Sequence, residues 1–186
     1  MTTRREARAA RQAGEVDDVE ATLVSHGRPS DAERLVNRLK ELGWTLGVAE
    51  SLTGGAVAAS VVSVPGASAV LRGGIVAYAT DIKQTVLGVD ATLLAAHGPV
   101  HPRVARQMAE GARRVLGRGD DAADVGIATT GIAGPVSPDG QPVGTVHLAV
   151  STPLGSRVES LVLTGDRQEI RAEAAALALR LAFDAL

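Results

Sequence analysis

The stretch that organises this chain reads Gly47-Val48-Ala49-Glu50-Ser51-Leu52-Thr53-Gly54-Gly55. The apolar run before it, residues 44–49, has the length of a strand, and the apolar run after it, residues 56–62, suits a buried helix. A strand-to-helix turn exposes side chains at a sheet edge and directs the unpaired N–H groups of a helix toward a ligand. Ser, Thr and Gly are also ordinary capping and turn residues, so the stretch alone fits a functional and a purely structural role equally well.

Periodicity and capping predict further elements on both sides of this turn. Ser30 and Glu33 form a capping box that opens a helix ending at Gly43, and Asp166 with Glu169 opens the closing helix. We expect further helices at 53–63, 80–86, 91–96 and 102–115, and strands at 44–50, 125–129, 143–150 and 158–163, with one strand or a strand pair at 69–71 and 74–78. This order predicts an α/β fold, a three-layer α-β-α sandwich with a mixed, mainly parallel central sheet.

The fold class indicates where a ligand would bind. Ligands of such sheets lie outside the carboxyl ends of the strands, where the turn after Glu50 and the loop after Thr129 are both expected. The loop at 130–135 follows a strand and is rich in Gly, so it could present N–H groups and hydroxyls to an anion. A tight surface loop held by Pro135 explains the same residues equally well.

Length and composition limit the class of protein. The 186 residues suffice for one sizeable core, which we assign to residues 30–186, and we interpret residues 1–29 as a flexible N-terminal extension. A net charge of −2 and a single Trp, Tyr and Phe argue against nucleic acid as a partner. No run approaches the roughly 18 apolar residues that span a membrane, and there is no secretory signal, so we expect a soluble, cytoplasmic protein.

The reactive side chains narrow the chemistry. The absence of Cys excludes disulfides, thiolate metal sites and a Cys nucleophile. Histidines and carboxylates show no metal-ligand spacing, so we expect neither a metal nor a cofactor. A Ser-His-Asp triad has little support, which leaves a Ser activated by Lys. Of the two lysines, Lys40 falls on an amphipathic helix, so Lys83 is the better candidate for a base that burial could tune.

Several motifs, in order, resemble those of the CinA C-terminal family, whose stand-alone members are nicotinamide-nucleotide amidohydrolases, also called NMN deamidases. Residues 49–55 look like its A-E-S-x-T-G-G signature, and residues 73–83 resemble G-G-x-x-x-Y-x-x-x-x-K. Residues 130–135 match T-G-I-A-G-P, and residues 142–146 resemble the P-V-G-T-V strand entry. The similarity extends over residues 30–186.

The resemblance implies a deamidation in which nicotinamide mononucleotide and water give nicotinic acid mononucleotide and ammonia. It assigns Ser51 as the nucleophile and Lys83 as its base. It assigns Tyr78 as the hydroxyl that assists proton transfer or orients Lys83. The small-molecule substrate is the only partner that the resemblance implies.

Substrate-binding roles can be inferred for the two loops. N–H groups near Thr53, Gly54 and Gly55 are expected to hold the oxyanion, because they belong to the turn that carries Ser51. The phosphate or ribose is expected at the 130–135 loop, with Arg167 as a further anion contact. The expected binding residues of that second region are Thr130, Gly131, Gly134 and Arg167.

The sequence departs from the family pattern at several positions. Asp81 stands where Asn is usual and would raise the pKa of Lys83 if its side chain turned inward. Leu52 replaces a frequent Cys, His101 replaces a common Ser, and the loop 136–141 lacks the usual glycine-rich, acidic composition. These departures leave open a nucleotide-binding module, associated with competence or DNA damage, that has kept the fold and lost turnover.

The sequence leaves two further alternatives open. A pterin- or nucleotide-binding protein with a Ser-capped turn would explain the first stretch, although the later motifs disfavour it. The apolar, aromatic-poor helices suggest a homo-oligomer, and no particular interface can be identified from the sequence.

Overall fold

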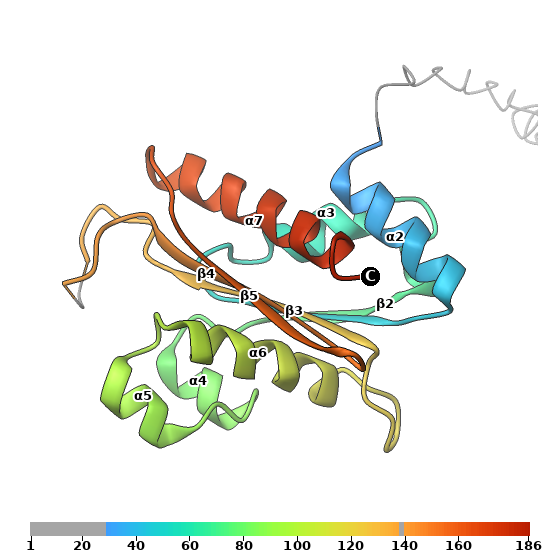
Figure 1. Cartoon of the computed structure of the whole chain (residues 1–186), viewed down its shortest axis with the longest axis horizontal. Coiled ribbons are helices and arrows are strands. Elements are labelled where there is room, and N and C mark those ends of the chain that lie inside the picture. Colours follow the sequence, from blue (N-terminus) through green and yellow to red (C-terminus); the bar gives the residue numbers. More distant parts are fainter. Residues whose placement is uncertain (1–28, 138–139) are drawn as a thin grey trace, which may run out of the picture.

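The computed structural model describes residues 29–137 and 140–186 (Figure 1). Apart from Pro29, the N-terminal extension predicted at 1–29 lies outside the described residues. The described part forms a five-stranded sheet between two layers of helices, as Figure 1 shows. The predicted α-β-α sandwich is therefore confirmed.

The sheet is mixed. Its strands are β1 (Leu46–Glu50), β2 (Leu71–Val76), β3 (Val125–Gly131), β4 (Thr145–Thr152) and β5 (Gly155–Val162), in the spatial order β2-β1-β3-β4-β5. β1 pairs in parallel with both β2 and β3, whereas β4 pairs antiparallel with β3 and β5. Four strands thus point in one direction and β4 alone is reversed, which confirms the mixed, mainly parallel sheet.

Helices cover both faces of the sheet. One layer contains α2 (Asp31–Leu42), α3 (Ala56–Val62) and α7 (Arg167–Phe183), and the other contains α4 (Thr80–Thr85), α5 (Ala91–His97) and α6 (Pro102–Val115) (Figure 1). A short 3₁₀ helix, η1 (Ala67–Ala69), precedes β2. Each layer packs its own buried apolar cluster against the sheet. No described helix has both the length and the apolar character needed to cross a bilayer.

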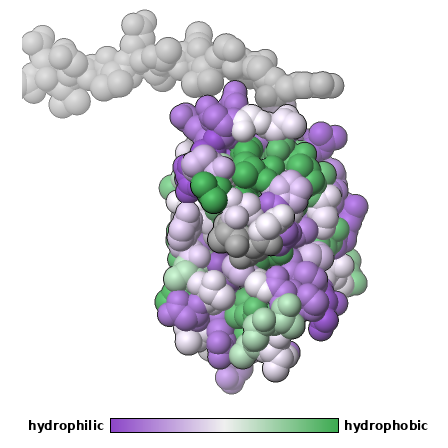
Figure 2. All heavy atoms as spheres, turned by 90° about the vertical axis from the view of Figure 1, so that its left-hand side faces the viewer, coloured by the Kyte–Doolittle hydropathy of each residue, from purple (hydrophilic) through white to green (hydrophobic). Residues whose placement is uncertain are grey.

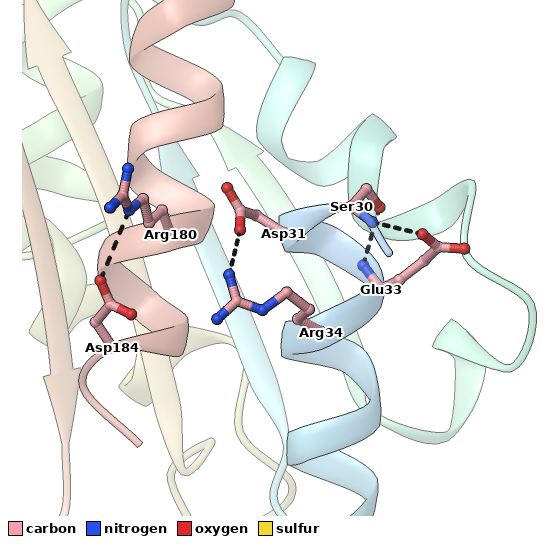
Figure 3. Close-up of polar contacts among 6 residues, drawn as sticks. All are labelled: Ser30, Asp31, Glu33, Arg34, Arg180 and Asp184. Atoms are coloured by element: carbon pink, nitrogen blue, oxygen red, sulfur yellow. Dashed lines mark hydrogen bonds and ion pairs between the residues drawn. The ribbon is translucent and has the colours of Figure 1, made fainter. Parts of the chain in front are cut away.

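The predicted helix caps are present. Ser30 accepts a hydrogen bond from the N–H of Glu33, whose carboxylate accepts one from the N–H of Ser30 (Figure 3). Asp166 and Glu169 make the same reciprocal pair at α7. The ion pairs Asp31–Arg34 and Arg180–Asp184 in Figure 3 lie near the surface and contribute little to stability.

His101 caps α6 in place of the common Ser. Its Nδ1 accepts a hydrogen bond of 3.2 Å from the N–H of Arg103, and Pro102 occupies the first turn of the helix, as predicted. Burial, followed by the neighbouring charges of His97 and Arg103, holds the pKa of His101 below its ordinary value. The neutral ring that results can accept the capping hydrogen bond.

Several predicted elements have different boundaries in the structure. The helix expected from residue 53 begins at Ala56, because Gly55 adopts a left-handed φ of 101° that ends the preceding turn. Of the strand or strand pair expected at 69–71 and 74–78, the structure forms one strand, β2, and Ala69 belongs to η1. Its Gly74 lies under α3, where a Cβ would come within 2.9 Å of the Ala58 Cβ.

Glycines in the sheet allow α6 to approach it closely. A Cβ on Gly126 in β3 would lie 2.0 Å from the carbonyl oxygen of Ala109, and one on Gly47 in β1 would lie 2.9 Å from that of Ala112. These clashes involve backbone atoms, so no side chain could rotate away to relieve them. Val115, the last residue of α6, is 44% exposed.

We predict that Gly126→Ala destabilises the fold, because α6 would have to move away from the sheet to accommodate the methyl group. The expected loss is about 1–3 kcal/mol in the free energy of unfolding. Urea denaturation followed by circular dichroism measures it. An unchanged midpoint would mean that α6 can shift without disturbing its packing.

Candidate active site

A cavity of about 200 Å³ opens at the carboxyl ends of β1 and β3. Seven of the ten predicted site residues line it: Ser51, Tyr78, Lys83, Thr130, Gly131, Gly134 and Arg167. Figure 2 faces this end of the molecule and shows hydrophobic groups (green) among hydrophilic ones (purple). A larger cavity of about 680 Å³ lies at the opposite ends of these strands, and neither Ser51 nor Lys83 lines it.

Ser51 and Lys83 are in direct contact in this cavity. Ser51 follows β1 immediately, and Lys83 reaches it from α4 with 3.0 Å between Nζ and Oγ. The same Nζ donates to the carbonyl oxygens of Ala77 at 2.7 Å and Tyr78 at 3.1 Å. A neutral amine has two N–H donors and one lone pair. Its donors therefore match the two carbonyls, and its lone pair can accept the hydroxyl proton of Ser51.

The environment of Lys83 favours the neutral amine. Its side chain is only 1% exposed, and this burial lowers the pKa of the amine to about 8. Asp81, the residue that was expected to raise this pKa if it turned inward, is exposed on α4. The pKa of Lys83 is thus lowered by burial and not raised by a neighbouring carboxylate.

Tyr78 occupies the rim of the cavity. Its ring is 59% exposed, and its hydroxyl accepts a hydrogen bond of 3.0 Å from Arg167. Lys83 is instead oriented by the main-chain carbonyl of Tyr78. The expectation that the Tyr78 hydroxyl orients Lys83 is therefore wrong: the residue contributes its carbonyl to the base and its phenol to the rim.

The turn residues Thr53, Gly54 and Gly55 do not line the cavity. The N–H of Gly54 donates to the carbonyl of Ser51 at 3.1 Å, and the N–H of Gly55 donates to Glu50 at 2.9 Å. The hydroxyl of Thr53 is buried against that of Thr129 at 2.7 Å. The oxyanion role expected for Gly54 and Gly55 is not supported by this geometry, because both glycine amides are already paired within the turn.

The buried carboxylate of Glu50 determines the shape of this turn. Its two oxygens accept hydrogen bonds of 2.9–3.1 Å from the N–H groups of Gly55, Val57 and Ala58 at the start of α3. Such a carboxylate satisfies amides that have no partner within the helix and interacts favourably with the helix dipole. Sequence reasoning missed this residue, although an acidic residue between an apolar strand and a helix start is a detectable signal.

Arg171 holds the same turn from the other side. This residue of α7 donates from Nε to the carbonyl of Leu52 at 2.8 Å and from its guanidinium to the carbonyl of Thr53 at 2.9 Å. The turn that carries Ser51 is thus fixed by a carboxylate at its N–H groups and by a guanidinium at its carbonyls. No local sequence signal reveals Arg171, because it lies 119 positions after Leu52.

The 130–135 loop forms the opposite wall of the cavity. The Thr130 hydroxyl donates to the carbonyl of Pro99 at 2.8 Å, and Arg167 donates to that of Gly134 at 2.8 Å. Arg167 therefore links the loop to Tyr78 across the rim. Within residues 29–137 and 140–186, no three His, Asp or Glu side chains gather as metal ligands.

We predict that Glu50→Gln lowers the free energy of unfolding by about 2 kcal/mol or more, because a neutral amide cannot accept three N–H donors and adds donors of its own. Urea denaturation measures this loss. Glu173→Gln, at an exposed position of α7, is the matched control and should leave the midpoint unchanged. Equal midpoints for the two variants would contradict the role assigned to Glu50.

Curated relatives share most of this chain. Residues 29–186 match the sequence model of the CinA C-terminal domain. A CinA-like protein from Frankia casuarinae is 51% identical over 137 residues, which cover 74% of this chain and 30% of the relative. A CinA-like protein from Anaeromyxobacter sp. strain K is 48% identical over 161 residues, which cover 86% of this chain and 38% of the relative. The chain thus spans less than half the length of these relatives.

Solved structures share the fold. A CinA superfamily protein from Klebsiella pneumoniae superposes with a TM-score of 0.77 at 32% identity, covering 83% of this chain and 94% of that one. A competence/damage-inducible protein from Agrobacterium tumefaciens gives a TM-score of 0.73 at 36% identity, covering 82% and 94%. By sequence and by structure, this chain belongs to the CinA C-terminal domain family.

Proposed function

We propose that this protein is an amidohydrolase that deamidates nicotinamide mononucleotide to nicotinic acid mononucleotide and ammonia, in pyridine-nucleotide salvage. The contact between Lys83 Nζ and Ser51 Oγ, with the remaining donors of the amine directed at two carbonyls, is the observation that carries this proposal. The choice of substrate rests on the motifs that the chain shares with NMN deamidases.

In the first step, Ser51 would attack the carboxamide carbon while Lys83 takes the hydroxyl proton. The tetrahedral intermediate then expels its amino group, which leaves as ammonia after receiving that proton from Lys83. The products of this step are ammonia and an ester between Ser51 and the nicotinoyl group. Lys83 returns to the neutral form, so the dyad needs no other proton donor.

The oxyanion of this intermediate needs N–H donors near Ser51. Among the described residues, the N–H of Leu52 has no hydrogen-bond partner, and Leu52 lines the cavity. The amide that follows a nucleophile at a strand-to-helix turn commonly serves this purpose. We therefore assign Leu52 N–H to the oxyanion in place of the glycine amides.

In the second step, a water molecule would attack the ester carbonyl. Neutral Lys83 takes a proton from this water, and the hydroxyl of Ser51 recovers it as the ester breaks. Nicotinic acid mononucleotide leaves with one oxygen from water. The step consumes one water and requires neither a metal nor a redox partner.

The nucleotide part of the substrate would lie along the 130–135 loop. Arg167 provides a positive charge at the rim, where its guanidinium donates to the Tyr78 hydroxyl, and Thr130 also lines the cavity. A guanidinium that is already fixed by Gly134 and Tyr78 is well suited to a phosphate, because little of its freedom is lost on binding.

Turnover is the direct test. Purified protein incubated with nicotinamide mononucleotide and a chelator should release ammonia and nicotinic acid mononucleotide. Ser51→Ala and Lys83→Ala should each reduce kcat by about 10³-fold or more, since both residues act in the same chemical step. Ser63→Ala and Lys40→Ala, at exposed positions outside the cavity, are the controls and should retain full activity.

The opposite outcome is equally informative. Tight binding of the nucleotide in calorimetry without turnover would exclude the amidohydrolase and favour the binding module associated with competence or DNA damage. Turnover that survives both substitutions would place the chemistry elsewhere.

The activity should also depend on pH through Lys83. We predict that kcat/KM rises with pH and levels off above about 8, because only the neutral amine accepts the Ser51 proton and burial lowers its pKa to about 8. At a pH below this value most of the amine is charged and inactive. Initial rates at substrate concentrations well below KM give this profile. A kcat/KM that does not change across this pH range would contradict Lys83 as the base.

A further inference from the structure

β5 forms an uncovered edge of the sheet. Every residue of this strand is exposed except Leu161, which is half-buried. β4 pairs with one side of it, and no strand among the described residues pairs with the other. In Figure 1, α7 and α6 lie above and below β5, and neither passes in front of it. Its outer side therefore presents backbone N–H and C=O groups to another strand.

We propose that β5 pairs with β5 of a second copy of this chain, antiparallel about a two-fold axis at Val158. The two five-stranded sheets would then form one continuous sheet. In this register, each residue lies opposite the residue that is equally far from Val158 on its other side. A closed, two-fold contact of this kind is the commonest way in which identical chains associate.

Charge complementarity supports this register. Arg157 and Glu159 flank Val158, so each arginine would lie opposite the glutamate of the second copy. The two side chains share one face of β5, because they pair with Val150 and Leu148, which belong to the same buried cluster of the sheet. Charges on an edge strand ordinarily prevent pairing. In this register Arg157 of one copy attracts Glu159 of the other, and the two-fold axis gives two such pairs in one dimer.

Apolar side chains match in the same register. Leu154, at the β4–β5 turn, is 84% exposed, and Val162, at the other end of β5, is 64% exposed. The register about Val158 brings each Leu154 to the Val162 of the second copy, and it brings the two Val158 side chains together. Pairing would therefore bury three apolar contacts that are exposed in the single chain.

The proposed contact leaves the active-site cavity free. No residue of β5 lines that cavity, which lies among β1, β3 and their following loops. The association is thus independent of the proposed reaction, and its test does not require turnover.

Cysteine crosslinking tests the register directly, because the chain contains no Cys. Val158→Cys would lie opposite itself, at a Cα separation of about 4.5–5.5 Å, which a disulfide spans. We expect this variant to form a disulfide-linked dimer under mild oxidation, seen as a doubled mass on a non-reducing gel. Ser160→Cys, in the same exposed strand, is the matched control: two copies would be about 13 Å apart and should stay unlinked.

Mixing provides a second check. The variants Ser156→Cys and Ser160→Cys should each run as a monomer on the non-reducing gel when oxidised separately. When the two variants are mixed before oxidation, they should form a disulfide with each other. A Val158→Cys variant that stays unlinked, or a Ser160→Cys variant that links as well as it does, would overturn the proposal.

Charge exchange tests the attraction in solution. By sedimentation velocity, we expect the wild type to reach twice the chain mass of 19.0 kDa at high concentration. Arg157→Glu and Glu159→Arg should each weaken the dimer by about tenfold or more, since like charges would face each other, and the double variant should restore it. A wild type that stays monomeric would overturn the proposal. So would a dimer whose affinity is unchanged by both single substitutions.

Discussion

The carboxylate of Glu50 is the interaction on which the site depends. A buried carboxylate is expensive to desolvate unless hydrogen bonds replace its water, and here three N–H groups of α3 do so. Because this residue ends β1 and the N–H groups that donate to it begin α3, the contact fixes the angle between strand and helix. Ser51, the next residue, is consequently held at the sheet edge with its hydroxyl toward the cavity. Arg171 completes the arrangement by fixing the carbonyls that follow.

Burial of Lys83 couples the stability of the fold to its chemistry. An amine placed away from water loses hydration, which favours its neutral form and lowers its pKa to about 8. The carbonyls of Ala77 and Tyr78 compensate for part of this loss. They belong to the segment between β2 and α4, so the backbone supplies two of the contacts of the amine and the Ser51 hydroxyl supplies a third. This arrangement requires no ionised partner, unlike a His held by an Asp.

Local signals predicted most of the fold, and long-range contacts account for what was missed. The caps at Ser30 and Asp166 and the apolar strands were predictable because their determinants lie within a few residues. The start of α3 was misplaced, since it depends on the left-handed Gly55 and on the acceptor supplied by Glu50. Within the site, motif order identified Ser51 and Lys83. The direction of the Tyr78 hydroxyl was not predictable, because it follows from Arg167, far along the chain.

Lysine is scarce in this chain, so the cavity contains a single lysine amine. Lys40 and Lys83 are the only lysines in the chain, and there is no thiol to compete with them. A small aldehyde or activated ester shaped for the cavity would meet a single amine there, largely uncharged in mildly alkaline solution and held rigidly by two carbonyls. Its adduct would appear on one internal peptide. A covalent ligand of this cavity can therefore be directed at a single amine, since Lys40 lies outside the cavity.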